Sequence, residues 1–145
     1  MMKNRKRLLF GVFLPLFIGA IIYIVLSPNA YLTKLFWNMI RIDNPFDGVK
    51  VSKMHIVVRM IRYYLCDFIW ALALTQSIIV ILGDKNLLIS GFVGIGFCSV
   101  CEIAQLFDSV PGTFDHIDLI VENLAVIFSI LTSLYIRRLH YEKGS

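Results

Sequence analysis

The stretch LLISGFVGIGFCSVCEIAQLF, residues 87–107, is predominantly apolar and carries one charged side chain, Glu102. A helix needs about 20 consecutive, mostly apolar residues to cross the hydrocarbon core of a bilayer. Three further apolar runs of similar length lie at about 8–26, 63–82 and 116–136. The sequence therefore predicts an all-α polytopic membrane protein with four transmembrane helices.

The composition excludes an ordinary soluble domain. Of the 145 residues, 58% are hydrophobic and 17% are charged, and the mean hydropathy is +0.76. Soluble globular domains are roughly 45–50% apolar and about a quarter charged. The connections between the later runs are too short to hold another fold, so we expect residues 1–145 to form a single membrane domain in contact with the lipid bilayer.

Basic residues gather at both ends of the chain. The net charge is +4, which the usual excess of lysine and arginine in cytoplasmic segments explains without nucleic acid as a partner. Four basic residues precede the first span, Lys85 lies between spans two and three, three basic residues follow the last span, and the connection 108–115 has none. This pattern predicts that both termini are cytoplasmic, although the first connection, 27–62, carries six basic residues and would face outside.

The first connection contains an amphipathic segment at about residues 30–42. Apolar and polar side chains occupy opposite faces at helical spacing: Leu32, Leu35, Phe36, Met39 and Ile40 against Lys34, Asn38 and Arg41. The segment is too short and too polar to span a bilayer. The pattern therefore predicts an interfacial amphipathic helix in the external loop.

Ionisable side chains converge on the outer ends of the last three spans. Asp67 lies about one turn inside span two, Glu102 and Gln105 lie in the last turns of span three, and several acids open span four. Such residues are costly in a membrane unless they are paired or hydrated, so they often mark a functional site. The candidate ligand-binding cluster consists of Arg62, Asp67, Glu102, Gln105, Asp115 and Asp118, in which Arg62 is the expected partner of the acids.

Helical periodicity places small and polar residues on one stripe of each of the last two spans. The stripe of span three is Gly91, Gly94, Cys98, Glu102 and Gln105, and that of span four is Asp115, Asp118, Glu122, Ser129 and Ser133. Small residues let helices approach closely in lipid. We therefore expect the two stripes to face each other and Glu102 to point into the bundle, near Arg62, Asp115 or Asp118.

Two interpretations of the cluster stay open. It can form an outward-facing pocket for a head group, a cation or a proton, or it can be a clamp of salt bridges and hydrogen bonds that fixes helix packing. Cys98 and Cys101 have the spacing of a redox or metal motif, but inside an apolar helix they fit packing better. Asp115 and Asp118 fit the capping of a helix start better than metal binding. We expect no metal and no cofactor, and we expect Asp84 to be solvated.

Two segments resemble the signature of the VanZ-like family of small bacterial membrane proteins. Glu102-Ile103-Ala104-Gln105, followed by Pro111-Gly112-Thr113-Phe114-Asp115-His116-Ile117-Asp118, is similar to the family pattern E-x-x-Q … G-T-x-D-x-x-D. Arg62 with Asp67-Phe68-Ile69-Trp70 resembles the start of the family's second helix, and Asn44-Pro45-Phe46 resembles its Pro-Phe turn. Glu122, Ala125 and Ser129 depart from the family, since they stand where it has an asparagine and two spaced glycines.

The resemblance implies a multi-pass protein of the bacterial cytoplasmic membrane, from a family named for an accessory role in glycopeptide-antibiotic resistance. We therefore expect a non-enzymatic envelope protein that binds or shields a membrane-anchored ligand, such as a cell-wall precursor or a lipoglycopeptide. Two alternatives stay open. One is a small transporter or proton-coupled carrier that uses Glu102, and the other is an intramembrane enzyme that acts on a lipid-linked substrate with paired carboxylates as acid and base.

Overall fold

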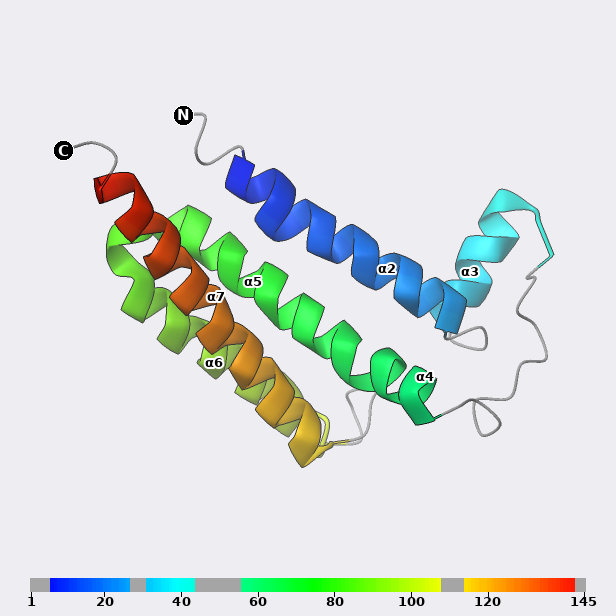
Figure 1. The fold of residues 1–145 in the computed structure, drawn as a ribbon. Coiled ribbons are helices and arrows are strands. Elements are labelled where there is room, and N and C mark those ends of the chain that lie inside the picture. Colours follow the sequence, from blue (N-terminus) through cyan, green and yellow to red (C-terminus); the bar gives the residue numbers. More distant parts are fainter. Residues whose placement is uncertain (1–5, 27–30, 44–55, 108–113, 143–145) are drawn as a thin grey trace.

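The structure is a computed structural model of the chain, and it describes residues 6–26, 31–43, 56–107 and 114–142. Every regular element in these ranges is a helix (Figure 1). The elements are, in chain order, a π-helical segment (Leu8–Phe13) that continues as α2 (Leu14–Leu26), α3 (Tyr31–Ile40), α4 (Ile56–Met60), a π-helical segment (Ile61–Leu65), α5 (Cys66–Leu82), a 3₁₀ turn (Asp84–Asn86), α6 (Leu87–Ala104) and α7 (His116–Glu142).

Four helical stretches are long and apolar enough to cross a membrane: Leu8–Val25, Ile56–Leu82, Asp84–Ala104 and His116–Leu139. Their outer faces carry large apolar side chains, such as Ile81 and Phe92, which are 80% and 75% exposed. Continuous exposed apolar surface of this kind suits hydrocarbon rather than water. The prediction of an all-α polytopic membrane protein with four transmembrane helices is confirmed.

The helix ends differ from the ends of the apolar runs. The second spanning helix begins at Ile56, within the predicted first connection, and the fourth continues beyond 136 to Glu142. The third ends at Ala104 rather than near 107, because the next three N–H groups donate to carbonyls three residues back and tighten the chain into a turn. Hydropathy locates the part of a helix that suits lipid, whereas backbone hydrogen bonding continues into polar residues on either side.

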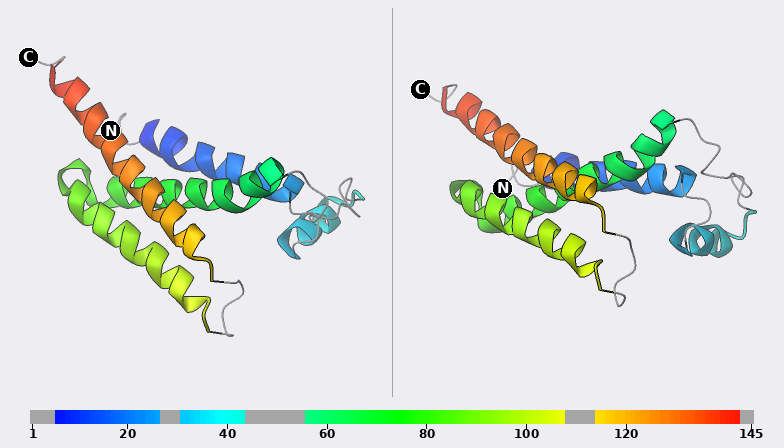
Figure 2. Two further views of the ribbon diagram at one scale, coloured as in Figure 1. Left: turned by 60° about the horizontal axis from the view of Figure 1, so that its bottom comes forward. Right: turned by 90° about the horizontal axis from the view of Figure 1, so that it is seen from below.

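Helix α5 is the central helix of the bundle. It packs against α2 and its π-helical start on one side, and against α6 and α7 on the other (Figure 1). Figure 2 shows α2 running beside α5, while α7 crosses α5 and packs along α6. The start of the first helix and the end of α7 lie at one end of the bundle, and α3 lies beyond the opposite end of α2 (Figure 1).

Small side chains build the core where α5, α6 and α7 meet. Its buried cluster consists of Ala71, Cys98, Ala125 and Val126. A Cβ atom on Gly94 of α6 would lie 3.2 Å from both Thr75 Oγ1 of α5 and Val126 Cγ1 of α7. Helices in lipid associate largely through close packing of this kind. The predicted packing of the glycine stripe of span three against α7 is confirmed, and α5 shares the contact.

The serines of α7 contact a different helix from the one predicted. Gln76 Nε2 of α5 donates to Ser129 Oγ at 2.8 Å and to Ser133 Oγ at 3.3 Å, and all three side chains are buried. The prediction had assigned these serines to the contact with α6 and did not foresee their hydrogen bonds to α5. An amide without a hydrogen-bond partner inside an apolar bundle would destabilise the fold. The two serine hydroxyls of α7 accept the hydrogen bonds that the amide of Gln76 donates.

We expect Gln76→Leu to lower the free energy of unfolding by about 1 kcal/mol, within the range measured for interhelical hydrogen bonds in membrane proteins. Leucine keeps most of the side-chain volume but removes the donor. Unfolding in detergent, followed by circular dichroism, measures the change. Ser77→Ala is the control, since Ser77 Oγ donates within its own helix to Ala73 O. Equal losses in the two variants would contradict a specific contribution from the α5–α7 contact.

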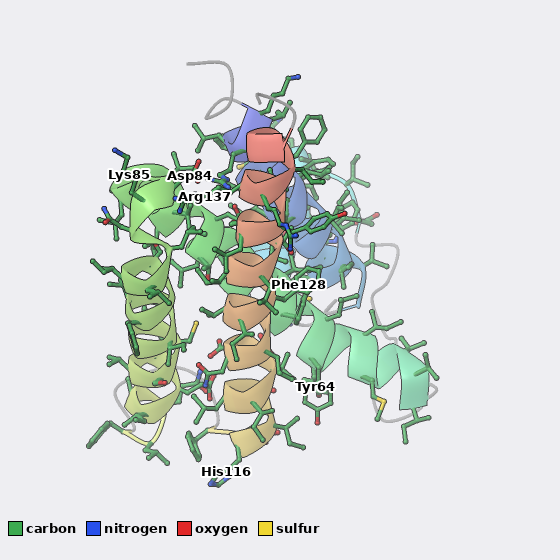
Figure 3. The ribbon with its side chains drawn as sticks, turned by 60° about the vertical axis from the view of Figure 1, so that its left-hand side comes forward. Tyr64, Asp84, Lys85, His116, Phe128 and Arg137 are labelled. Carbon is green, nitrogen blue, oxygen red and sulfur yellow. The ribbon has the colours of Figure 1, made fainter. Side chains whose placement is uncertain are left out.

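Asp84 joins three helices at the end of the bundle where the first helix begins. Its carboxylate forms a salt bridge with Arg7, and its backbone carbonyl accepts a hydrogen bond from Arg137 Nη1 at 3.3 Å. Figure 3 shows Asp84 and Arg137 together at this end. The expectation that Asp84 is solvated is therefore wrong, because the turn between α5 and α6 lies between the basic ends of the first and last helices.

Helix α3 lies within the amphipathic segment predicted at 30–42. It ends at Ile40, and the next residue, Arg41, has a φ of 56°, which a helix does not continue. Leu35 and Met39 of its apolar stripe are exposed. This apolar face is therefore available to lipid, and the position of α3 along the membrane surface stays a prediction.

Candidate functional site

A cavity of about 520 Å³ lies between α5 and α6, with one residue each of α2 and α7 on its wall. Its acids and its amide gather where α5 begins and α6 ends: Asp67, Glu102, Gln105 and Glu122, while Ser77 lines it farther along α5. The helical repeat explains this convergence, since Asp67, Ala71 and Leu74 recur at i, i+4 and i+7 on the face of α5 that lines the cavity. The volume is that of an ordinary ligand pocket.

The cavity opens on the lipid-facing side of the bundle. Trp70 and Phe97 line it and are 57% and 55% exposed. Cys101 lines it as well and is also exposed. Farther in, the wall is apolar, with Leu16 of α2 and Leu74 of α5. A molecule anchored in the bilayer can therefore enter between α5 and α6 from the side.

Glu102 is the most enclosed of the acids. Its side chain is 5% exposed, and its Oε1 accepts a hydrogen bond from Gln105 Nε2 at 3.0 Å. Its Oε2 has no hydrogen-bond partner among the residues that the structure describes. The prediction that Glu102 points into the bundle is confirmed. A buried carboxylate oxygen without a partner destabilises a fold, so this atom is a candidate for contact with a ligand.

Like charges surround Glu102. Asp67 is close enough to Glu102 and Asp118 to be repelled by their negative charges. Glu122 is repelled by the charges of all three acids. One carboxylate oxygen each of Asp118 and Glu122 is also buried without a hydrogen-bond partner within the described part of the chain. Acids on three helices therefore present several acceptor atoms to one space. A cationic or donor-rich group would relieve their mutual repulsion.

The structure does not place all members of the predicted cluster at the cavity. Asp67, Glu102 and Gln105 line the cavity, and Asp118 lies beside it. Asp115 does not reach it, because its Oδ1 accepts the N–H of Ile117 at 2.8 Å and caps α7, as the alternative interpretation predicted. The side chain of Arg62 and the connection 108–113 lie outside the described residues.

Glu122 belongs to the cavity but was absent from the predicted cluster. The sequence offered a signal, since Glu122 follows Asp118 by four residues and both lie on the same stripe of α7. Gln76 was also missed, and its signal was the polar run Thr75-Gln76-Ser77 in the middle of an apolar span. Both residues were recognisable as buried polar groups. Their partners lie on other helices, and spacing along one helix does not identify such partners.

No family model, curated protein or solved structure matches this chain. The resemblance to VanZ-like proteins therefore stays a prediction from its motif. Within that motif, Glu102 and Gln105 line the cavity, Asp118 lies beside it and Asp115 caps α7.

The polar side chains that line the cavity suit an organic head group better than a bare metal ion. Among the described residues, no three His, Cys, Asp or Glu side chains are grouped closely enough to hold a metal ion. Apolar walls adjoin the acids in the cavity. This arrangement can accept hydrogen bonds from ammonium or hydroxyl groups of one molecule while apolar surface holds the rest of it.

Proposed function

We propose that this protein is a VanZ-like protein of the bacterial cytoplasmic membrane that binds the polar head of a membrane-anchored envelope ligand without reacting with it. The observation that carries this proposal is Glu102, a buried carboxylate in a cavity open to lipid, one of whose oxygens has no hydrogen-bond partner among the residues that the structure describes. A purely structural acid would be expected to have both oxygens satisfied.

The two parts of the cavity match the two parts of such a ligand. Leu16, Leu74 and Phe97 offer apolar surface to a lipid chain. The acids offer acceptors to a head group rich in hydroxyl or amino groups, which is the chemistry of a lipid-linked cell-wall precursor or a lipoglycopeptide. The lateral opening at Trp70 suits a ligand that never leaves the bilayer.

The proposed orientation puts both termini in the cytoplasm and the acids near the outer surface. Lys85 and Arg137 lie at the opposite end of the bundle from His116 (Figure 3), and Arg7 lies with them because it pairs with Asp84. Lysine and arginine near span ends favour the cytoplasmic side. The cavity then faces the leaflet in which envelope precursors and glycopeptides meet.

Cysteine labelling tests this orientation. Lys85 and His116 are both exposed, and each is changed to cysteine in a protein whose native cysteines are replaced by alanine or serine. In intact cells we expect a membrane-impermeant maleimide to modify H116C, and to modify K85C only after permeabilisation. The reverse pattern would move the acids to the cytoplasmic face.

Complementation tests the function. A host strain that lacks the gene is expected to be more sensitive to glycopeptide or lipoglycopeptide antibiotics, and wild type should restore resistance. Glu102→Gln and Asp67→Asn should fail to restore it, because each removes one charge from the cavity. Asp43→Asn is the matched control, since Asp43 is exposed and lies outside the cavity. Full complementation by a well-inserted Glu102→Gln protein would refute the proposal.

A further inference from the structure

A second cavity lies on the other side of α5, between the π-helical start of the first helix (Leu8–Phe13) and α7. It has a volume of about 640 Å³, and its wall includes Phe10 and Gly11 of the first helix, Gln76 of α5 and Phe128 of α7. The first cavity shares none of these residues. The second cavity is therefore a separate space, whose contents do not depend on the acids at the other end of the bundle.

The walls of this cavity suit a hydrocarbon chain. Phe10 and Phe128 line it and are 62% and 53% exposed, so it also opens toward lipid. Gly11 lets the first helix lie close against Gln76 in the floor, since a Cβ atom there would lie 3.3 Å from Gln76 Cγ. The hydrogen bonds from Gln76 to the serines of α7 use the polar groups of the floor. The interior therefore offers mainly apolar contact.

The mouth of the cavity is cationic. Lys6 and Arg7 line it, and Lys6 is exposed. Arg7 forms a salt bridge with Asp84, which Arg137 also contacts. Among the described side chains that line or contact the mouth, Lys6, Arg7 and Arg137 outnumber the single carboxylate of Asp84, and Figure 3 shows Arg137 beside Asp84. A negatively charged head group is the complementary partner.

We propose that this second cavity binds one anionic phospholipid, with its phosphate at Lys6 and Arg7 and an acyl chain against Phe10 and Phe128. The apolar walls favour a lipid over a soluble anion, and the net positive charge that Lys6, Arg7 and Asp84 leave at the mouth favours an anionic lipid over a zwitterionic one. The lipid would lie between the π-helical start of the first helix and α7, against α5. The inference stands independently of the proposed function, because it uses neither Glu102 nor Asp67.

Competition between lipids tests the inference. The full-length protein in detergent is mixed with equal amounts of phosphatidylglycerol and phosphatidylcholine with the same acyl chains, and native mass spectrometry counts the bound lipids. Wild type should retain phosphatidylglycerol preferentially. Lys6→Gln should reduce that preference about fivefold, the effect expected for one lysine near an anionic head group. Thr132→Leu should reduce binding of both lipids, since Thr132 lines the cavity and leucine fills it.

Lys85→Gln is the matched control, because Lys85 is an exposed cation at the same end that does not line the cavity. It should leave the preference unchanged. Equal retention of the two lipids by wild type, or equal losses in Lys6→Gln and Lys85→Gln, would overturn the inference. A dimer that Thr132→Leu dissociates, with no lipid preference, would assign the cavity to a second copy of the chain and overturn it too. Glu102→Gln should bind phosphatidylglycerol as wild type does, which separates this result from any failure of the proposed function.

Discussion

Replacing Gly94 with leucine should destabilise the bundle by about 3 kcal/mol, the upper part of the range for overpacking a close-packed core. Thr75 of α5 and Val126 of α7 lie 3.2 Å from the position of a Cβ atom on Gly94. Thr75 cannot move aside freely, because it is fully buried and its hydroxyl donates to Ala71 O at 2.7 Å. Helix α6 must therefore separate from both neighbours to admit a larger side chain.

Gly96→Leu supplies the control for this substitution. Gly96 lies two residues further along the same helix, and a Cβ atom there would have no neighbour within 4 Å. The change in helix propensity is the same at both positions, so the difference between the variants reports packing alone. Unfolding in detergent should give a Gly96→Leu protein at least as stable as wild type. Similar losses of unfolding free energy at both positions would contradict the placement of Gly94 at the close contact of α6 with α5 and α7.

The fold was predictable because lipid imposes one strong requirement. Each span must be a helix with an apolar exterior, so runs such as 87–107 reveal their structure from composition alone. Gly94 and Glu102 were also assigned to the interior correctly, since a small residue and a charge are both better placed there than against lipid. These predictions concern single helices, whose outward and inward faces follow from their own periodicity.

Which helix a buried face meets was less predictable. Ser129 and Ser133 were expected to face α6, but Gln76 of α5 draws them to the central helix. Asp84 was expected to be solvated, but Arg7 reaches it from a position far away in the sequence. In both cases one polar group found its partner on a non-adjacent part of the chain. Three-dimensional arrangement decides such pairings, and periodicity along one helix carries no information about them.

The same limit applies to the candidate site. Asp67, Glu102 and Gln105 were assigned to one cluster because all three lie at the same depth, and the cavity brings them together. Asp115 was included for the same reason, but a free N–H group at the start of α7 holds its carboxylate locally. Depth therefore predicts which polar groups can meet. Local capping and the rotation of each helix decide which of them do.

Glu102→Gln should raise the free energy of unfolding by about 1 kcal/mol or more, because it removes a buried negative charge that lies among other acids, and burying such a charge is destabilising by at least that amount. The side chain is 5% exposed, and Glu102 Oε2 has no hydrogen-bond partner among the described residues. Glutamine keeps an oxygen that can accept the hydrogen bond from Gln105 and removes the charge that repels Asp67 and Glu122.

The two interpretations of the cluster predict opposite signs for this variant. If the acids form a clamp, removing one member of an ion-paired network should destabilise the protein by about 3–5 kcal/mol. If Glu102 serves a ligand, its loss should leave a more stable protein that no longer functions, because binding sites retain groups that the fold alone would not favour. Unfolding in detergent without ligand, with Asp43→Asn as the neutral control, measures the sign. A destabilised Glu102→Gln protein would identify the cluster as a clamp and remove the observation on which the proposed ligand site rests.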